Sequence, residues 1–160
     1  MNLVVDTKYL RLAVIGIILA VGVIVIAFQH HSAQTACGPY RNDKTVSVGI
    51  HRLAAETATN VTAWNKGLSG RPCITSDEAM LFIFPRASQY AFWMKDMRFP
   101  IDIIWISQAH RVVAIEDNVR PSTYPDHFVN QKQNPAKYTL EIAGNSRKNL
   151  GINLGTAVNF

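Results

Sequence analysis

Residues 101–116 read IDIIWISQAHRVVAIE, and this stretch decides the fold class. The first six residues are apolar except for Asp102, and apolar residues resume at Val112 after a short, mostly polar segment. A short run that is apolar on both faces and rich in β-branched residues is typical of a strand buried on both sides. Residues 107–110 are long enough for a hairpin loop. The sequence therefore predicts two antiparallel strands, and with them a β-rich protein.

Further strands are expected on both sides of this hairpin. Val46, Val48 and Ile50 alternate with polar residues, which is typical of a half-buried strand. The run MLFIF at 80–84 is continuously apolar up to Pro85, which we expect to end it. Additional strands are predicted at 91–94, 138–142 and 157–160.

Helices are expected in only two places. Residues 59–68 favour a short helix that Thr59 or Asn60 can cap, and residues 145–150 favour a turn or two. Residues 120–134 contain prolines without sustained periodicity and are expected to form a long surface loop. The prediction is a mainly β, compact single domain, a barrel-like fold or a sandwich, with one or two short helices.

A separate segment precedes this domain. Residues 12–28, LAVIGIILAVGVIVIAF, contain no charged or polar side chain. As a helix they would extend about 26 Å, slightly less than the ~30 Å hydrocarbon core of a bilayer. A cleaved signal peptide is the alternative, but Gln34-Thr35-Ala36 is a poor cleavage site, so we favour a retained transmembrane anchor that contacts inner-membrane lipid.

Basic residues predict the orientation of this anchor. Lys8 and Arg11 precede it, and no lysine or arginine follows before Arg41, so residues 1–11 are expected in the cytoplasm. Residues 29–44 then form a linker, and residues 45–160 an extracytoplasmic domain of a single-pass plasma-membrane protein. In that compartment the only two cysteines, Cys37 and Cys73, can form a disulfide, although the sequence does not give their separation.

Composition and charge exclude several classes of protein. The chain is 48% hydrophobic and has one long apolar run, so it is neither disordered nor a polytopic membrane protein. Past residue 36, 14 basic and 10 acidic residues leave a charge of +4, scattered along the sequence. This pattern suits an anionic envelope polymer or a lipid surface and argues against nucleic acid. No motif for a metal or a cofactor is present, so none is expected.

Several strings resemble one family when taken together in order. They are GLSGR at 67–71, MLFIF at 80–84, FWMKDM at 92–97, PIDIIWI at 100–106 and YTLEIAG at 138–144, followed by Gly151 and Gly155. In this order they resemble the domain of unknown function family 192, small prokaryotic proteins that often carry a signal peptide or a membrane anchor. The resemblance covers about residues 45–160 and implies a small β-rich, barrel-like fold, but it brings no activity and no catalytic residues.

The candidate site centres on carboxylates in strands. Asp102 interrupts an apolar strand, and a buried charge needs a partner, so it either lines a cleft or is paired with Arg71 or with backbone donors. Glu141 lies between Leu140 and Ile142, and the simplest interpretation has it facing solvent. Trp93 belongs to an aromatic stretch that suits either the core or a stacked sugar.

Two functions follow as alternatives. The first is a non-enzymatic binding or envelope-associated module, which uses a groove near Arg71, Trp93, Lys95 and Asp102 to hold an envelope polymer or protein. The second is a hydrolase of an envelope saccharide or peptide, with Asp102 and Glu141 as paired carboxylates about 5–9 Å apart. The first is preferred because no catalytic constellation is present.

Overall fold

The hairpin predicted from residues 101–116 is present in the computed structural model, which describes residues 37–160. Strand β5 (Ile101–Ile106) pairs antiparallel with β6 (Val112–Val119). All six residues of β5 are buried, as expected of a strand that is covered on both faces. The predicted anchor at 12–28 lies outside the described residues, and none of the described helices is long and apolar enough to span a bilayer.

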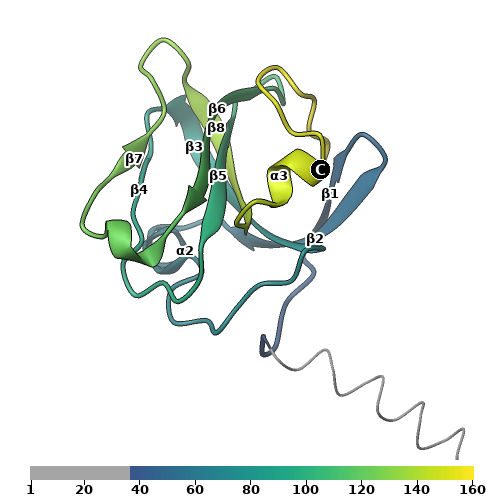
Figure 1. Cartoon of the computed structure of the whole chain (residues 1–160). Coiled ribbons are helices and arrows are strands. Elements are labelled where there is room, and N and C mark those ends of the chain that lie inside the picture. The colour runs from purple at the N-terminus through teal and green to yellow at the C-terminus, as the bar shows by residue number, and fades with distance from the viewer. Residues whose placement is uncertain (1–36) are drawn as a thin grey trace, which may run out of the picture. The chain divides into compact units, whose positions relative to one another are not determined.

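Six strands form one sheet in the order β1-β2-β3-β8-β5-β6 (Figure 1). Neighbouring strands are antiparallel except for β2 and β3, which are parallel and are connected through helix α2. The remaining four strands of the sheet are β1 (Lys44–Val48), β2 (His51–Ala58), β3 (Glu78–Ser88) and β8 (Ala136–Ala143).

The sheet is open, so the predicted barrel is wrong. The edge strands β1 and β6 do not pair with each other, because the last residues of the chain lie between them. These residues make only isolated bridges, from Asn159 to Ser47 of β1 and from Ala157 to Arg111 beside β6. The strand expected at 157–160 is reduced to these two bridges.

Smaller elements cover the two faces of the sheet. A two-stranded sheet of β4 (Ala91–Phe92) and β7 (Phe128–Val129) lies on the same side as α2 (Val61–Lys66) (Figure 1). The 3-10 helix η2 (Pro121–Thr123) precedes β7, and α3 (Ser146–Asn149) follows β8. The loop expected at 120–134 thus contains a short strand.

Helix α2 begins as the sequence predicts. The Asn60 side-chain oxygen accepts a hydrogen bond from the Ala63 amide at 3.0 Å, a standard N-cap. The helix ends at Gly67, whose φ of 47° is in a region that favours glycine. Within the helix, the Trp64 indole N–H donates to the Ala58 carbonyl at 2.9 Å, which fixes the ring over the end of β2.

Two hydrophobic clusters lie on opposite faces of the sheet. Successive side chains of a strand point to opposite faces, so Ile104 and Leu140 enter one cluster while Ile103 and Trp105 enter the other. The first cluster is closed by Ile152 and Val158 from the C-terminal segment. The second cluster is closed by the α2 region and by the β4–β7 sheet, and it is the richer in aromatic rings.

Two strand boundaries differ from the prediction for physical reasons. Strand β3 continues past Pro85 to Ser88, because its pairing with β8 is interrupted by a register shift between Ile83 and Ser88, where proline costs no ladder hydrogen bond. Ile50, expected inside a strand, lies in the β1–β2 turn and is 92% exposed.

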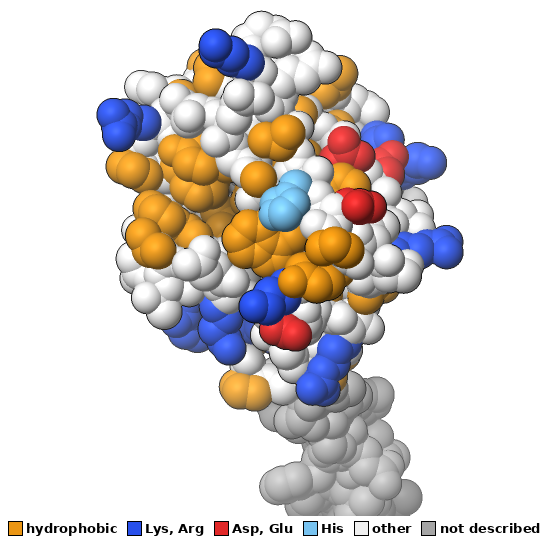
Figure 2. All heavy atoms as spheres, turned by 90° about the vertical axis from the view of Figure 1, so that its left-hand side faces the viewer, with side chains coloured by type: hydrophobic (Ala, Val, Ile, Leu, Met, Phe, Trp, Pro, Cys, Tyr) orange, Lys and Arg blue, Asp and Glu red, His pale blue; other side chains and the backbone are white. Residues whose placement is uncertain are grey.

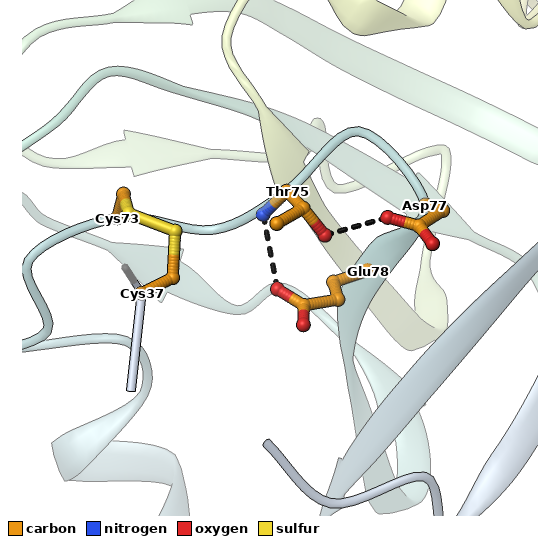
Figure 3. Close-up of a disulfide and its surroundings, with 5 residues drawn as sticks. All are labelled: Cys37, Cys73, Thr75, Asp77 and Glu78. Carbon is orange, nitrogen blue, oxygen red and sulfur yellow. Dashed lines mark hydrogen bonds between the residues drawn. A yellow bond between two sulfur atoms is a disulfide. The ribbon is translucent and has the colours of Figure 1, made fainter. Parts of the chain in front are cut away.

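The linker was expected at residues 29–44, but Lys44 already belongs to β1, and residues 37–43 are held against the sheet. A disulfide joins Cys37 to Cys73, with the two Cα atoms 4.8 Å apart (Figure 3). Beyond Cys73, the Thr75 amide donates to the Glu78 carboxylate at 3.0 Å, which orders the loop into β3. The Tyr40 hydroxyl accepts from the amides of Glu56 and Ala79, both at 3.0 Å, and so connects β2 to β3.

Candidate functional site

A pocket of about 200 Å³ opens on the face that carries α2 and β4, and we name it the aromatic pocket. Its walls come from α2 and the turn after it, from β3, from β4 and its flanks, and from β8. The lining residues are Trp64, Asn65, Lys66, Gly67, Leu68, Ser69, Phe82, Phe84, Tyr90, Ala91, Phe92, Trp93, Met97 and Glu141.

The aromatic rings of the lining support one another. Phe84 stacks on Tyr90 with ring centroids 3.5 Å apart, and Phe82 meets Phe92 edge-on at 5.0 Å. Trp64 packs against Phe84 at 5.3 Å. Such contacts stabilise a fixed arrangement beyond the simple burial of area. The walls of the pocket are therefore largely preformed.

Glu141 is the one acidic residue in the lining of this pocket, and its side chain is buried. It projects from β8 into the aromatic cluster, is 5% exposed, and its Oε2 has no hydrogen-bond partner among the described residues. Burial raises the pKa of Glu141 to about 8, because the ionised carboxylate would lose its solvation there. At neutral pH Glu141 is therefore largely protonated and neutral.

Gly67 leaves room beside this carboxyl. A Cβ added at Gly67 would lie 3.7 Å from Glu141 Oε2 and 3.4 Å from the Phe82 ring. A larger side chain would extend into the same space. The glycine that ends α2 thus also keeps the floor of the pocket open.

Asp102 has a different environment. It is fully buried, and its carboxylate accepts hydrogen bonds from three backbone amides: Asn118 at 2.7 Å, and Asn145 and Arg147 at 2.9 Å. Three amide donors satisfy a buried carboxylate well. Asp102 therefore connects β6 and the start of α3 to β5. Of the alternatives that the sequence left open for Asp102, the structure has the pairing with backbone donors.

The two carboxylates do not form a catalytic pair. Asp102 is opposite Ile142 in the β5–β8 register, and Glu141 is opposite Ile103. Directly paired residues share a face and successive residues alternate, so Asp102 and Glu141 point to opposite faces of the sheet. Asp102 and Glu141 therefore lack the arrangement that paired-carboxylate hydrolysis needs.

Of the predicted groove residues, only Trp93 lines the aromatic pocket. Arg71 instead pairs with the buried Glu56 at 2.6 Å and lies over the Tyr40 ring. Lys95 is exposed, and its carbonyl accepts a hydrogen bond from the Ser69 hydroxyl at 2.8 Å. Arg71, Trp93, Lys95 and Asp102 therefore do not line one groove.

The structure adds lining residues that the sequence analysis missed, chiefly Trp64, Phe82, Phe84 and Tyr90. One signal was available: Phe82 and Phe84 are two apart in a strand, so both rings lie on one face. What placed them around an open space rather than in a filled core was the position of α2, which strand periodicity does not report. Within residues 37–160 no group of three or more His, Cys, Asp or Glu side chains could hold a metal ion.

The surface around the pocket is also apolar. Figure 2 shows hydrophobic side chains gathered around a histidine on the side of the molecule that carries β4, β7 and α2. Trp93 contacts His127 edge-on at 5.4 Å, and Tyr124 and Val129 are about half exposed, at 51% and 49%.

Comparison with known proteins agrees with this fold. A family model named DUF192 and described as "Uncharacterized ACR" matches residues 43–160. The chain belongs to the DUF192 family. This confirms the resemblance noted from the sequence, and the structure now gives this member a pocket.

Two solved structures are similar to this DUF192 chain. A protein of unknown function from Novosphingobium aromaticivorans is 30% identical, with a TM-score of 0.65 over 72% of this chain and 84% of that one. A structure from Sinorhizobium meliloti, described as a "putative transcription regulator", is 24% identical with the same TM-score, over 72% of this chain and 89% of that one, and shows the fold alone. No curated protein matches the chain.

Proposed function

We propose that residues 37–160 are a binding module whose site is the aromatic pocket. The observation that carries this proposal is the buried Glu141 carboxyl without a hydrogen-bond partner among the described residues. An unpaired buried polar group costs about 1–3 kcal/mol, so it is usually kept for a purpose. A ligand that donates a hydrogen bond to Oε2, or brings a positive charge next to it, would recover this free energy.

The surroundings of Glu141 support binding rather than catalysis. The other hydroxyls of the lining are already engaged, since Ser69 donates to the Lys95 carbonyl and Tyr90 to the Arg86 carbonyl at 2.7 Å. Neither is poised as a nucleophile beside Glu141. The lining offers apolar surface with one buried polar group, which is the composition of a small-molecule site.

We also propose that this module is tethered at the outer side of the plasma membrane by residues 12–28, with residues 1–11 in the cytoplasm. The apolar run, its two preceding basic residues and the Cys37–Cys73 disulfide support this location, because disulfides persist in oxidising compartments. The ligand would then be an envelope component, free or part of a larger polymer, lipid or protein, and not a nucleic acid.

A pair of matched variants tests the pocket as the binding site. Ala91 lines the pocket and is exposed, whereas Ala87 is exposed but outside the lining. Tryptophan at position 91 should fill the mouth, while Ala87→Trp adds the same side chain elsewhere. The purified full chain is titrated with choline, N-acetylglucosamine, benzamide and indole, and binding is followed by calorimetry.

At least one of these probes should bind the wild-type chain and the Ala87→Trp variant and bind Ala91→Trp at least about tenfold more weakly, a loss of ~1.4 kcal/mol. Binding of none of the four, or equal binding by both variants, would contradict the proposal.

A further inference from the structure

Aromatic rings make up much of the lining of the pocket that contains Glu141. Phe82, Phe84 and Phe92 are buried in the lining, and Trp64, Tyr90 and Trp93 complete it. The face of an aromatic ring carries partial negative charge and attracts cations. A buried carboxyl among such rings makes a site that favours positive charge, and the one cation of the lining, Lys66, is exposed at the end of α2.

From this geometry we infer that the ligand of the aromatic pocket carries a small organic cation, an alkylated ammonium group. The inference rests on the proposed function and names the class of ligand. The cation would lie against the rings, with its charge next to Glu141 Oε2, and would take the place of the proton on the carboxyl. One positive charge would satisfy the unpaired oxygen and the ring faces together.

The size and polarity of the pocket argue for this class over a sugar. A volume of about 200 Å³ is below the ~300–1,000 Å³ of pockets for drug-sized molecules, so it suits a compact group. A saccharide would bury several hydroxyls, each of which needs a partner. The lining supplies few, since Asn65 and Lys66 are exposed at the end of α2 and the Ser69 hydroxyl is already engaged.

Charge provides the sharpest experiment. Choline and 3,3-dimethylbutan-1-ol have the same shape, but only choline carries a positive charge. Calorimetry with the full chain at about pH 9, where most of Glu141 is ionised because its pKa is about 8, should give choline a dissociation constant about 30-fold lower than that of the alcohol. This factor corresponds to ~2 kcal/mol for a desolvated cation over aromatic rings.

Glu141→Gln keeps the shape of the side chain and removes its charge, so the preference for choline should fall several-fold. Glu116→Gln removes an exposed charge of β6, outside the pocket, and should leave the preference unchanged. Unfolding of both variants in urea shows that each is folded. Equal binding of choline and the alcohol by the wild-type chain, or an unchanged preference in Glu141→Gln, would overturn the cation assignment.

Other results separate this inference from the proposed function. If N-acetylglucosamine, benzamide or indole binds and choline does not, the pocket is a binding site but not for cations. If none of the probes binds, both proposals fail. Glycerophosphocholine identifies the source of the cation: binding tighter than that of choline assigns a lipid headgroup, and weaker binding assigns a free solute, and either agrees with a cationic ligand.

The pH dependence of choline affinity gives an independent check. Below its pKa of about 8, Glu141 must lose a proton to accept the cation, so affinity should rise up to about pH 8 and then level off. The other titratable groups around the pocket are Lys66, Tyr90 and, against Trp93, His127, and the same titration on His127→Asn removes the histidine contribution. Affinity that falls as pH rises would instead indicate a ligand that accepts a hydrogen bond from protonated Glu141.

Discussion

At the scale of single residues, Glu141 couples stability to pH. Its pKa is 4.5 when unperturbed and about 8 when buried in the folded chain. The folded state therefore holds a proton that the unfolded state releases between these values, so the free energy of unfolding falls as pH rises from about 4.5 to 8. The total loss is on the order of 5 kcal/mol.

We predict that Glu141→Gln removes this loss, because glutamine has no charge to bury. The variant should be several kcal/mol more stable than the wild-type chain near pH 9 and differ little near pH 5. Urea unfolding of both proteins across this range measures the effect, with Asp126→Asn as a control at an exposed carboxylate. A wild-type stability that does not decline between pH 5 and 8 would mean that the Glu141 carboxyl is solvated.

Replacing Asp102 by its neutral amide should destabilise the protein, whereas the same change at Glu141 stabilises it. In Asp102→Asn one oxygen that accepts backbone hydrogen bonds becomes an amide group, which faces amide donors from Asn118, Asn145 or Arg147. We expect a loss of about 3 kcal/mol in the free energy of unfolding. Ligand affinity per folded molecule should not change, and a large change measured by calorimetry would show that Asp102 contributes to the site.

These two carboxylates show what a residue type in a strand can and cannot predict. A carboxylate inside an apolar strand needs hydrogen-bond or charge partners, and backbone amides were among the partners expected for Asp102. Glu141 appeared as the polar position of an alternating strand, for which solvent is the simplest environment. Because α2 and β4 cover that face of the sheet, the same position is buried, and local periodicity carries no information about such a cover.

At the scale of elements, strongly apolar segments were predictable and others were not. The β5–β6 hairpin, β8, the core of β3 and the capped helix α2 follow from patterns of apolar residues. Strand β2 reads HRLAAETA and was missed, because alanine has a low preference for strands and only Leu53 is large and apolar. Barrel closure was also expected wrongly, since strand content does not determine whether the two edge strands meet.

Residues 37–43 depend on the disulfide for their position against the sheet. The Cys37–Cys73 disulfide closes a loop of sequence separation 36 and keeps Tyr40 between β2 and β3. Chain-entropy arithmetic gives a contribution of roughly 3–4 kcal/mol for such a loop. We predict that the Cys37→Ser and Cys73→Ser double variant loses about this much stability in urea unfolding without reductant.

A reducing agent supplies the control for this prediction. It should destabilise the wild-type chain by a similar amount and leave the double variant unchanged. Wild-type stability that does not respond to the reductant, with free thiols shown by alkylation, would contradict a stabilising role for the crosslink.

At the scale of the whole molecule, the membrane tether is the main prediction from sequence. The full chain should fractionate with membranes and resist extraction by salt, because burial of the apolar residues 12–28 exceeds what headgroup electrostatics supplies. Protease added to cells with a permeabilised outer membrane should digest the domain and spare cytoplasmic markers. Protection of the domain from the protease would mean that the predicted orientation is wrong.

The central claim is that Glu141 is a neutral carboxyl, without a hydrogen-bond partner among residues 37–160, in the pocket that we propose binds a ligand. The most direct measurement is an NMR titration of its side-chain carboxyl carbon in the full chain, assigned by comparison with Glu141→Gln. We predict a midpoint near pH 8 in the free protein and a lower midpoint with saturating choline, because the bound cation favours the ionised carboxylate. A midpoint near 4.5 in the free protein, unmoved by choline, would contradict this account.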